Sequence, residues 1–170
     1  MSNLDISNIK VLIVDDNAFM RRILMHILQG LHVRKIVQAA DGADAFDKLQ
    51  NFEPDIILVD WEMTSVDGLE FIKMIRNDDR KQDRFIPIIL VTAHSQEYRV
   101  MQARDAGINE MLIKPVSAEL LYKRIQAVVE RPRPFVDAPD FFGPDRRRRQ
   151  VKFLGIDRRH AEMEIIFADT

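Results

Sequence analysis

Three short apolar runs limit the folds that this chain can adopt. Residues 11–14 read VLIV, and residues 56–59 and 88–91 both read IILV. Runs that are apolar at every position are typical of strands buried on both faces, as in a parallel sheet. Residues 34–39 and 111–113 are weaker strand candidates. The sequence therefore predicts five strands that are mostly covered on both sides.

Between these runs, apolar residues recur at helical spacing. The sets are Phe19, Met20, Ile23, Leu24, Ile27 and Leu28; Leu69, Ile72 and Ile75; and Leu120, Leu121, Ile125, Val128 and Val129. Another helix is expected to begin at Gly42 and Ala43, and Ser117 is the expected N-cap of the last one. A strand–helix order repeated five times predicts an α/β fold, with right-handed crossovers and a doubly wound five-stranded parallel sheet.

Composition excludes several classes of protein. The chain has 170 residues, 46% of them hydrophobic and 31% charged, so it can bury a core and should be soluble. Its net charge of −2 gives no overall attraction to nucleic acid or membranes. The absence of cysteine excludes disulfides and thiolate metal sites. No apolar run is long enough for a membrane span, and residues 1–10 do not resemble a secretory signal, so we expect a cytoplasmic protein.

The last forty residues differ from the rest in composition. Residues 131–170 contain four of the seven prolines and carry a net charge of +2. The sequence Arg-Pro-Arg-Pro after Glu130 cannot continue a helix, so we place a domain boundary there: residues 1–130 form one domain and 131–170 a C-terminal extension.

Polar residues stand where the expected strands end. Asp15 and Asp16 follow the first strand, Asp60 the third, Thr92 the fourth and Lys114 the fifth. Sites in open parallel sheets lie at the carboxyl ends of the strands. Oxygen-only ligands favour a hard cation such as Mg²⁺, and an ammonium and a hydroxyl beside them suit a phosphoryl group. Each residue alone is more often an ordinary turn or cap residue, but their joint placement favours a site.

Residues 8–130 resemble the receiver domain of two-component response regulators, most closely the CheY-type chemotaxis regulators. The motifs are Val14-Asp15-Asp16, Met20-Arg21-Arg22-Ile23, Ala40-Asp41-Gly42-Ala43-Asp44-Ala45, Asp60-Trp61-Glu62-Met63, Asp67-Gly68-Leu69-Glu70, Val91-Thr92-Ala93 and Lys114-Pro115. This family has a flavodoxin-like (βα)5 fold and serves as a phosphoacceptor signalling switch rather than a turnover enzyme.

The resemblance implies a role for each site residue. Asp60 would accept a phosphoryl group from a sensor histidine kinase or a phosphotransfer protein. Asp15, Asp16, Asp60 and the backbone carbonyl of Glu62 would hold Mg²⁺. Thr92 would hydrogen-bond the phosphoryl group and Lys114 would pair with it.

The chain departs from the family pattern at several positions. Thr64 stands where the family usually has proline, a difference from which we expect small consequences. The resemblance implies that Glu62 faces the attacking water; His94 would border the same route or is simply a solvated histidine. Met111 replaces a frequent aromatic that turns inward on phosphorylation; we expect it either to fill a gap beside Thr92 or to be a plain edge residue.

The output surface and the extension carry further expectations. Tyr98, Met101 and Arg104 of the fourth helix and Tyr122 of the fifth are expected to border the face that reads the switch.

The extension contains no helix-turn-helix, and so we expect no DNA-binding domain. It repeats a short motif, Gly143–Arg148 against Gly155–His160, and two stretches, 151–156 and 164–167, could be short strands. It is either disordered or an interaction segment, because its phenylalanines and arginines favour partner surfaces. As an interaction segment it would lie on its own receiver, join two copies as a homodimer, or bind a kinase. Phosphorylation-dependent signalling by protein contact is therefore the expected function, and a phosphorylation-independent scaffold acting through the extension is the alternative.

Overall fold

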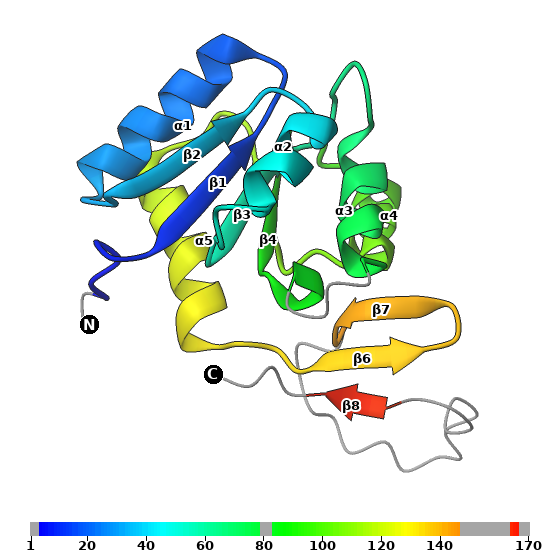
Figure 1. The fold of residues 1–170 in the computed structure, drawn as a ribbon. Helices are drawn as coiled ribbons and strands as arrows, with labels where there is room; N and C mark the ends of the chain where they lie inside the picture. Colours follow the sequence, from blue (N-terminus) through cyan, green and yellow to red (C-terminus); the bar gives the residue numbers. More distant parts are fainter. Residues whose placement is uncertain (1–3, 79–82, 147–163, 167–170) are drawn as a thin grey trace.

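A five-stranded parallel sheet forms the centre of the molecule (Figure 1). The computed structural model describes residues 4–78, 83–146 and 164–166. The strand order is β2-β1-β3-β4-β5, which confirms the predicted doubly wound, flavodoxin-like fold. The strands are β1 (Lys10–Val14), β2 (Lys35–Ala39), β3 (Ile56–Asp60), β4 (Ile88–Thr92) and β5 (Glu110–Ile113).

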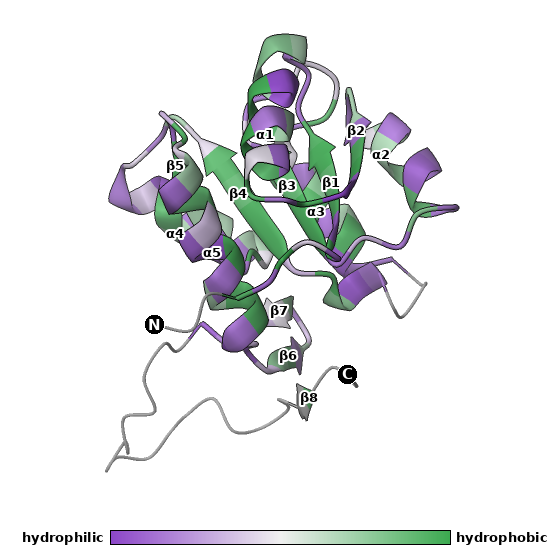
Figure 2. Ribbon diagram, turned by 90° about the vertical axis from the view of Figure 1, so that its left-hand side faces the viewer, coloured by the Kyte–Doolittle hydropathy of each residue, from purple (hydrophilic) through white to green (hydrophobic). Residues whose placement is uncertain are grey.

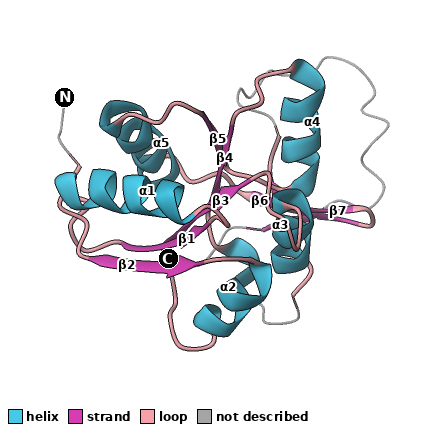
Figure 3. Cartoon of the chain, turned by 90° about the horizontal axis from the view of Figure 1, so that it is seen from above, coloured by secondary structure: helices cyan, strands magenta, loops and turns pink. Residues whose placement is uncertain are grey.

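Five helices cover the two faces of this sheet. They are α1 (Ala18–Gly30), α2 (Gly42–Leu49), α3 (Gly68–Arg76), α4 (Glu97–Ala106) and α5 (Ala118–Glu130). Viewed from above, α1 and α5 lie on one face, and α2, α3 and α4 lie on the other (Figure 3). A short 3-10 helix, η1 (Asp83–Phe85), precedes β4. Among the described residues, no helix combines the length and the apolar composition that a membrane span requires.

The core consists of two apolar layers that the sheet separates. Leu12 and Val14 of β1 point into the layer under α2, α3 and α4, and Val11 and Ile13 point into the layer under α1 and α5. The central strands are apolar along their length (Figure 2), as their sequences predict. Because residues of a strand alternate between faces, a run that is apolar at every position supplies both layers at once.

Short polar side chains begin four of the helices at the carboxyl edge of the sheet. Asn17, Asp41, Asp67 and Ser117 each accept a hydrogen bond from a backbone N–H of the first turn. The prediction of Ser117 as an N-cap is thereby confirmed. These caps fix where each helix leaves the loop that carries the polar strand-end residues.

Three of the residues expected on the inner helix faces lie outside the core. Phe19 of α1 is 64% exposed, and Leu120 and Val129 of α5 are each 41% exposed. In both helices the buried stripe is narrower than the sequence pattern indicates, since only Leu24 and Leu28 of α1 are buried. Spacing alone does not distinguish the edge of an apolar stripe from its centre.

The C-terminal part of the chain adds a small antiparallel sheet below the main one (Figure 1). Its strands are β6 (Phe135–Ala138), β7 (Phe141–Pro144) and β8 (Glu164–Ile166), in the order β7-β6-β8. The strand expected at 164–167 is found at 164–166. The other expected strand, at 151–156, and the second copy of the repeated motif lie outside the described residues.

A buried arginine joins the elements at the amino edge of the sheet. Arg76, at the end of α3, is 2% exposed. Its guanidinium donates to the carbonyl oxygens of Gly107 (2.9 Å), Arg84 (2.7 Å) and Ile86 (2.8 Å). It also donates to the Asn109 side-chain oxygen at 3.1 Å. Burial lowers the pKa of Arg76 to about 9, and this ring of neutral oxygens compensates the cost of desolvating the charge.

Replacing Arg76 by lysine tests this arrangement. Lysine keeps the charge, but its single ammonium cannot reach all four oxygens that the planar guanidinium contacts. Some of these buried oxygens would therefore lose their hydrogen-bond donor. We expect Arg76→Lys to lower the free energy of unfolding by about 3 kcal/mol in urea denaturation. Arg22→Lys, at an exposed position of α1, is the matched control and should change it by less than about 0.5 kcal/mol. Equal effects of the two substitutions would contradict the assignment.

Candidate functional site

The polar residues predicted to converge do meet at the carboxyl edge of the sheet. Asp15 and Asp16 directly follow β1, Asp60 and Thr92 are the last residues of β3 and β4, and Lys114 directly follows β5. Because the five strands are parallel and paired in register, their carboxyl ends form one edge. The fold therefore brings residues nearly a hundred positions apart into one site.

Three carboxylates form the centre of the site. Asp15, Asp16 and Asp60 each offer an oxygen, and these oxygens lie within 4.8 Å of one another. Asp15 is 1% exposed; one of its carboxylate oxygens accepts from the Asn17 backbone N–H at 2.8 Å. The other, Oδ2, is the buried polar side-chain atom without a hydrogen-bond partner among the described residues. An unpaired carboxylate oxygen facing two further acids is a natural ligand for a hard cation.

The charges of this cluster are unfavourable as they stand. Burial raises the pKa of Asp15 to about 6, and the neighbouring Asp60 adds to the rise, against the Asn17 hydrogen bond that lowers it. Burial also raises the pKa of Asp60, although Lys114 counteracts this. Both shifts disfavour the ionised forms, and a bound cation would reverse them.

Lys114 and Thr92 flank Asp60. The Lys114 ammonium lies 2.7 Å from Asp60 Oδ1. The Thr92 hydroxyl oxygen accepts from the backbone N–H of His94 at 3.0 Å, which leaves the hydroxyl hydrogen able to donate. The backbone N–H of Lys114 donates to the Thr92 carbonyl at 2.8 Å and so holds the two residues at a fixed separation.

The loop between β3 and α3 packs tightly against the site. A Cβ atom at Gly68 would lie only 2.0 Å from the backbone oxygen of Asp60, so only glycine fits at that position. The Thr64 backbone N–H donates to Asp16 Oδ2 at 2.8 Å. Proline has no N–H and could not make this bond, so the residue at position 64 contacts a carboxylate of the cluster. The small effect expected of this departure stays a prediction.

Glu62 and His94 contact each other across the site entrance. His94 Nε2 lies 2.7 Å from Glu62 Oε1. The His94 ring also meets Trp61 edge-on, with 5.9 Å between centroids. The Glu62 side chain therefore turns toward His94, and its role as a metal ligand, expected through the backbone carbonyl, stays a prediction.

Met111 lies on the edge strand β5, opposite Leu90 of β4. Its half-buried side chain packs against the apolar layer under α2, α3 and α4. Its position on the edge strand agrees with the expectation of an edge residue, and a gap-filling role beside Thr92 stays a prediction. Its movement on phosphorylation stays a prediction.

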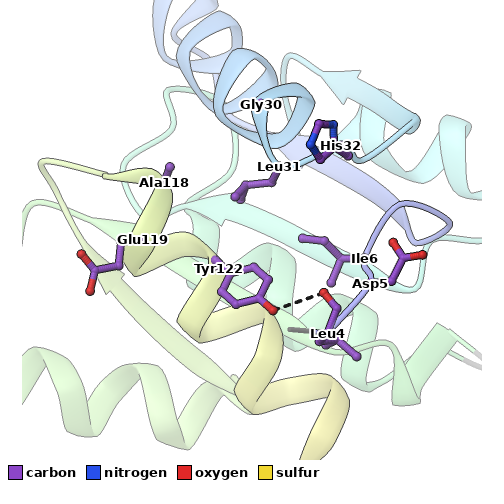
Figure 4. A pocket seen from close by; sticks show the side chains of 9 residues that line it. All are labelled: Leu4, Asp5, Ile6, Gly30, Leu31, His32, Ala118, Glu119 and Tyr122. Carbon is purple, nitrogen blue, oxygen red and sulfur yellow. Dashed lines mark hydrogen bonds between the residues drawn. The ribbon is translucent and has the colours of Figure 1, made fainter. Parts of the chain in front are cut away.

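A separate pocket of about 500 Å³ lies between the N-terminal segment, α1 and α5 (Figure 4). Tyr122 lines it, and its hydroxyl donates to the backbone oxygen of Leu4 at 3.2 Å. Tyr122 thus faces the N-terminal segment, whereas Tyr98 and Met101 of α4 are more than half exposed. None of the acids of the cluster lines this pocket.

Sequence reasoning missed several residues that position the site. The Arg21 guanidinium donates to the backbone oxygen of Asp15 at 2.7 Å, and Asn17 holds the Asp15 carboxylate. Arg99 of α4 lies over the Trp61 ring, 5.0 Å from its centroid. A polar residue within two positions of an expected ligand is a usable signal for Asn17. The Arg99 contact joins residues 38 positions apart, and no local pattern indicates it.

Comparison with known proteins agrees with this geometry. Residues 11–126 match the model of the response regulator receiver domain. The chain is 33% identical to the chemotaxis protein CheY of Pseudomonas aeruginosa over 122 residues, which cover 72% of this chain and 97% of that protein. It is 32% identical to CheY-3 of Vibrio cholerae over 124 residues, 73% of this chain and 94% of that protein.

Solved structures give the same result. CheY4 of Vibrio cholerae is similar with a TM-score of 0.65 and 33% identity, over 71% of this chain and 98% of that one. The receiver domain of the sensor histidine kinase PA1611 from Pseudomonas aeruginosa has a TM-score of 0.65 and 27% identity, over 72% of this chain and 98% of that one. That structure has a magnesium ion coordinated in its active-site cleft. The chain belongs to the response regulator receiver domain family.

Proposed function

We propose that this protein accepts a phosphoryl group on Asp60, in a magnesium-dependent reaction, from a phosphohistidine of a sensor kinase or phosphotransfer protein. The observation that carries the proposal is the position of Asp60, at the tip of β3 within 2.7 Å of Lys114 and clustered with Asp15 and Asp16. The protein then signals by contact with a downstream protein and acts in the cytoplasm. It is a switch rather than a turnover enzyme.

Asp60 supplies the nucleophile. One carboxylate oxygen attacks the phosphorus in line as the phosphorus–nitrogen bond to the donor imidazole breaks, and the imidazole leaves with that electron pair. The product is an acyl phosphate on Asp60. Water later cleaves it, which restores the carboxylate and releases inorganic phosphate.

Lys114 and Thr92 stabilise the transferred group. The ammonium that pairs with Asp60 before transfer offsets negative charge on the phosphoryl oxygens after it. The Thr92 hydroxyl, oriented by the His94 N–H, donates to one of these oxygens. The Lys114 ammonium lies beside Asp60 before transfer, so this group would need little reorganisation during transfer.

Asp15, Asp16 and Asp60 would hold the magnesium ion, together with the backbone carbonyl of Glu62. The unpaired Asp15 Oδ2 and the spacing of the three acids support this set. When bound, the ion supplies positive charge that offsets the charge on the phosphoryl oxygens. The donor set contains only oxygen, as Mg²⁺ prefers.

We assign the downstream contact to the α4–β5–α5 face, where Tyr98 and Met101 are exposed. Arg104 lies on the same helix, next to the C-terminal extension. We assign no DNA-binding or membrane role to the protein, and we propose a homodimer through the extension as a second use of that segment. A phosphorylation-independent scaffold acting through the extension is the alternative function.

Labelling by a small phosphodonor tests the proposal. With acetyl phosphate or phosphoramidate and Mg²⁺, we expect one label per chain on the wild type, none on Asp60→Asn, and none after removal of magnesium by a chelator. Asp47→Asn, at an exposed position of α2, is the control and should be labelled like the wild type. Absence of label from every variant would favour the scaffold.

Asp15→Asn should separate stability from function. The folded-state pKa of Asp15 is raised to about 6 from 3.8, so the native state binds more protons than the unfolded state between these values. In the absence of magnesium, the wild type therefore loses stability as pH rises from 4 to 7.

We expect Asp15→Asn to remove this loss and to raise the free energy of unfolding at pH 7 by roughly 2 kcal/mol, with little effect at pH 4. The same variant should lose magnesium-dependent labelling. Urea denaturation at both pH values measures the first effect, with Asp47→Asn as control. A variant that is less stable than the wild type at pH 7 would refute the interpretation of Asp15.

A further inference from the structure

The C-terminal hairpin of β6 and β7 packs on the receiver at the amino edge of the sheet. The rings of Phe135 and Phe142 are buried and meet Phe85 of η1 edge-on, with centroids 5.0 and 5.3 Å apart. The Arg84 guanidinium lies 3.7 Å from the centroid of Phe142. Aromatic burial with cations over the rings gives this contact the character of a core rather than of a loose tail.

The backbones of the hairpin and the receiver also touch. Gly107 ends α4 with a φ of 95°, and a Cβ there would lie 3.1 Å from the Phe142 carbonyl oxygen. A Cβ at Gly143 of β7 would lie 2.9 Å from the Cα of Gly107. With no side chain between them, a displacement of the α4–β5 turn by less than an ångström disturbs β7.

Three arginines fix the carboxyl end of α4 to the hairpin. Arg104 donates to the backbone oxygen of Arg146 at 2.8 Å, and the Arg146 guanidinium lies 2.9 Å from Asp105. Arg133 donates to the carbonyl oxygens of Ile108 and Asn109 in the turn between α4 and β5. The hairpin thus holds the last turn of α4 and the residues that follow it.

The other end of α4 begins at the phosphorylation site. The loop before it carries His94, whose N–H is bonded to Thr92, and Arg99 in its first turn lies over Trp61, the neighbour of Asp60. Of the ten residues of α4, all of them described, only Ala103 and Ala106 are buried. A helix that buries so little apolar surface, about 15 Å long, is held mainly by its two ends.

We infer that docking of the β6–β7 hairpin and phosphorylation of Asp60 oppose each other through α4. The inference rests on the proposed function. In the structure the hairpin is docked while Lys114 pairs with the unphosphorylated Asp60. A phosphoryl group on Asp60 takes over Lys114 and Thr92, shifts the start of α4, and moves Asp105 and Gly107 away from their partners in the hairpin. The hairpin is an intramolecular ligand of the resting state, and linkage makes the effect reciprocal.

The first test uses beryllium trifluoride with magnesium as a phosphoryl mimic on the full chain. Trp61 is the single tryptophan of the sequence and adjoins Asp60, so its fluorescence reports occupancy of the site. Hydrogen exchange of the peptide covering residues 131–146 reports docking. We expect exchange of this peptide to become at least about fivefold faster on binding, and to stay unchanged in Asp60→Asn.

The second test loosens the hairpin without touching the site. Gly143→Ala places a methyl group against the Gly107 backbone, whereas Gly30→Ala at the end of α1 meets nothing within 4 Å and is the matched control. We expect Gly143→Ala to speed hydrogen exchange of residues 131–146 and to increase the rate of Asp60 labelling by acetyl phosphate about fivefold or more. Gly30→Ala should behave as the wild type in both measurements.

The outcomes separate this inference from the proposed function. If the mimic changes Trp61 fluorescence but not hairpin exchange, the coupling is refuted and the phosphoacceptor function stands. The same holds if Gly143→Ala loosens the hairpin and the labelling rate does not change. If Gly143→Ala leaves the hairpin docked, the mimic experiment decides alone. If neither mimic nor phosphodonor acts on Asp60, both proposals fail.

Discussion

The burial of neighbouring carboxylates at one edge of the sheet is the constraint on which the rest of the site depends. The parallel sheet places Asp15, Asp16 and Asp60 at adjacent strand tips, where burial and the neighbouring carboxylates raise the pKa values of Asp15 and Asp60. Lys114 supplies one positive charge, to Asp60, and Asp15 Oδ2 has no hydrogen-bond partner within the part of the chain that the structure describes. A bound cation would stabilise these ionised carboxylates. A phosphoryl group at the site would then be surrounded by cations rather than by carboxylates alone. The same charges would favour binding of a divalent cation, such as the magnesium ion proposed for this site.

The two edges of the sheet treat buried charge differently: the amino edge holds a cation, and the carboxyl edge holds a cluster of acids. At the amino edge, Arg76 is surrounded by neutral oxygens that satisfy its donors, and the region is fixed. At the carboxyl edge, the acids lack an equivalent set of donors. A fully satisfied network rigidifies a fold, whereas a partly satisfied one responds to a ligand. The molecule therefore has a rigid edge and a responsive edge, and α4 runs between them.

The sequence predicts the doubly wound parallel sheet and the identity of the strand-end residues from local patterns, and the receiver family from the resemblance of its motifs. Uniformly apolar runs indicate buried strands, and polar residues directly after them must share an edge in a parallel sheet. Exposure of Phe19 and Leu120 was not predictable, since helical spacing does not say how wide the buried stripe is. Arg76 and Gly107 read as ordinary surface and turn residues; their partners come from distant segments. The Thr64 bond to Asp16 depends on loop geometry that no spacing encodes.

The hairpin contacts the receiver through its aromatic rings and its backbone. Within the described residues the small sheet has only three short strands, which gives it little core of its own, and the rings of Phe135 and Phe142 pack against Phe85 and Arg84 of the receiver. The hairpin is therefore ordered by its contacts with the receiver surface. That surface is continuous with α4, and the loop before α4 is bonded to Thr92 through the His94 backbone N–H. A change at the proposed phosphorylation site would therefore need to move only one weakly buried helix to affect the hairpin. An element that is stabilised mostly by docking is more sensitive to small movements of the surface beneath it than an independently folded domain is.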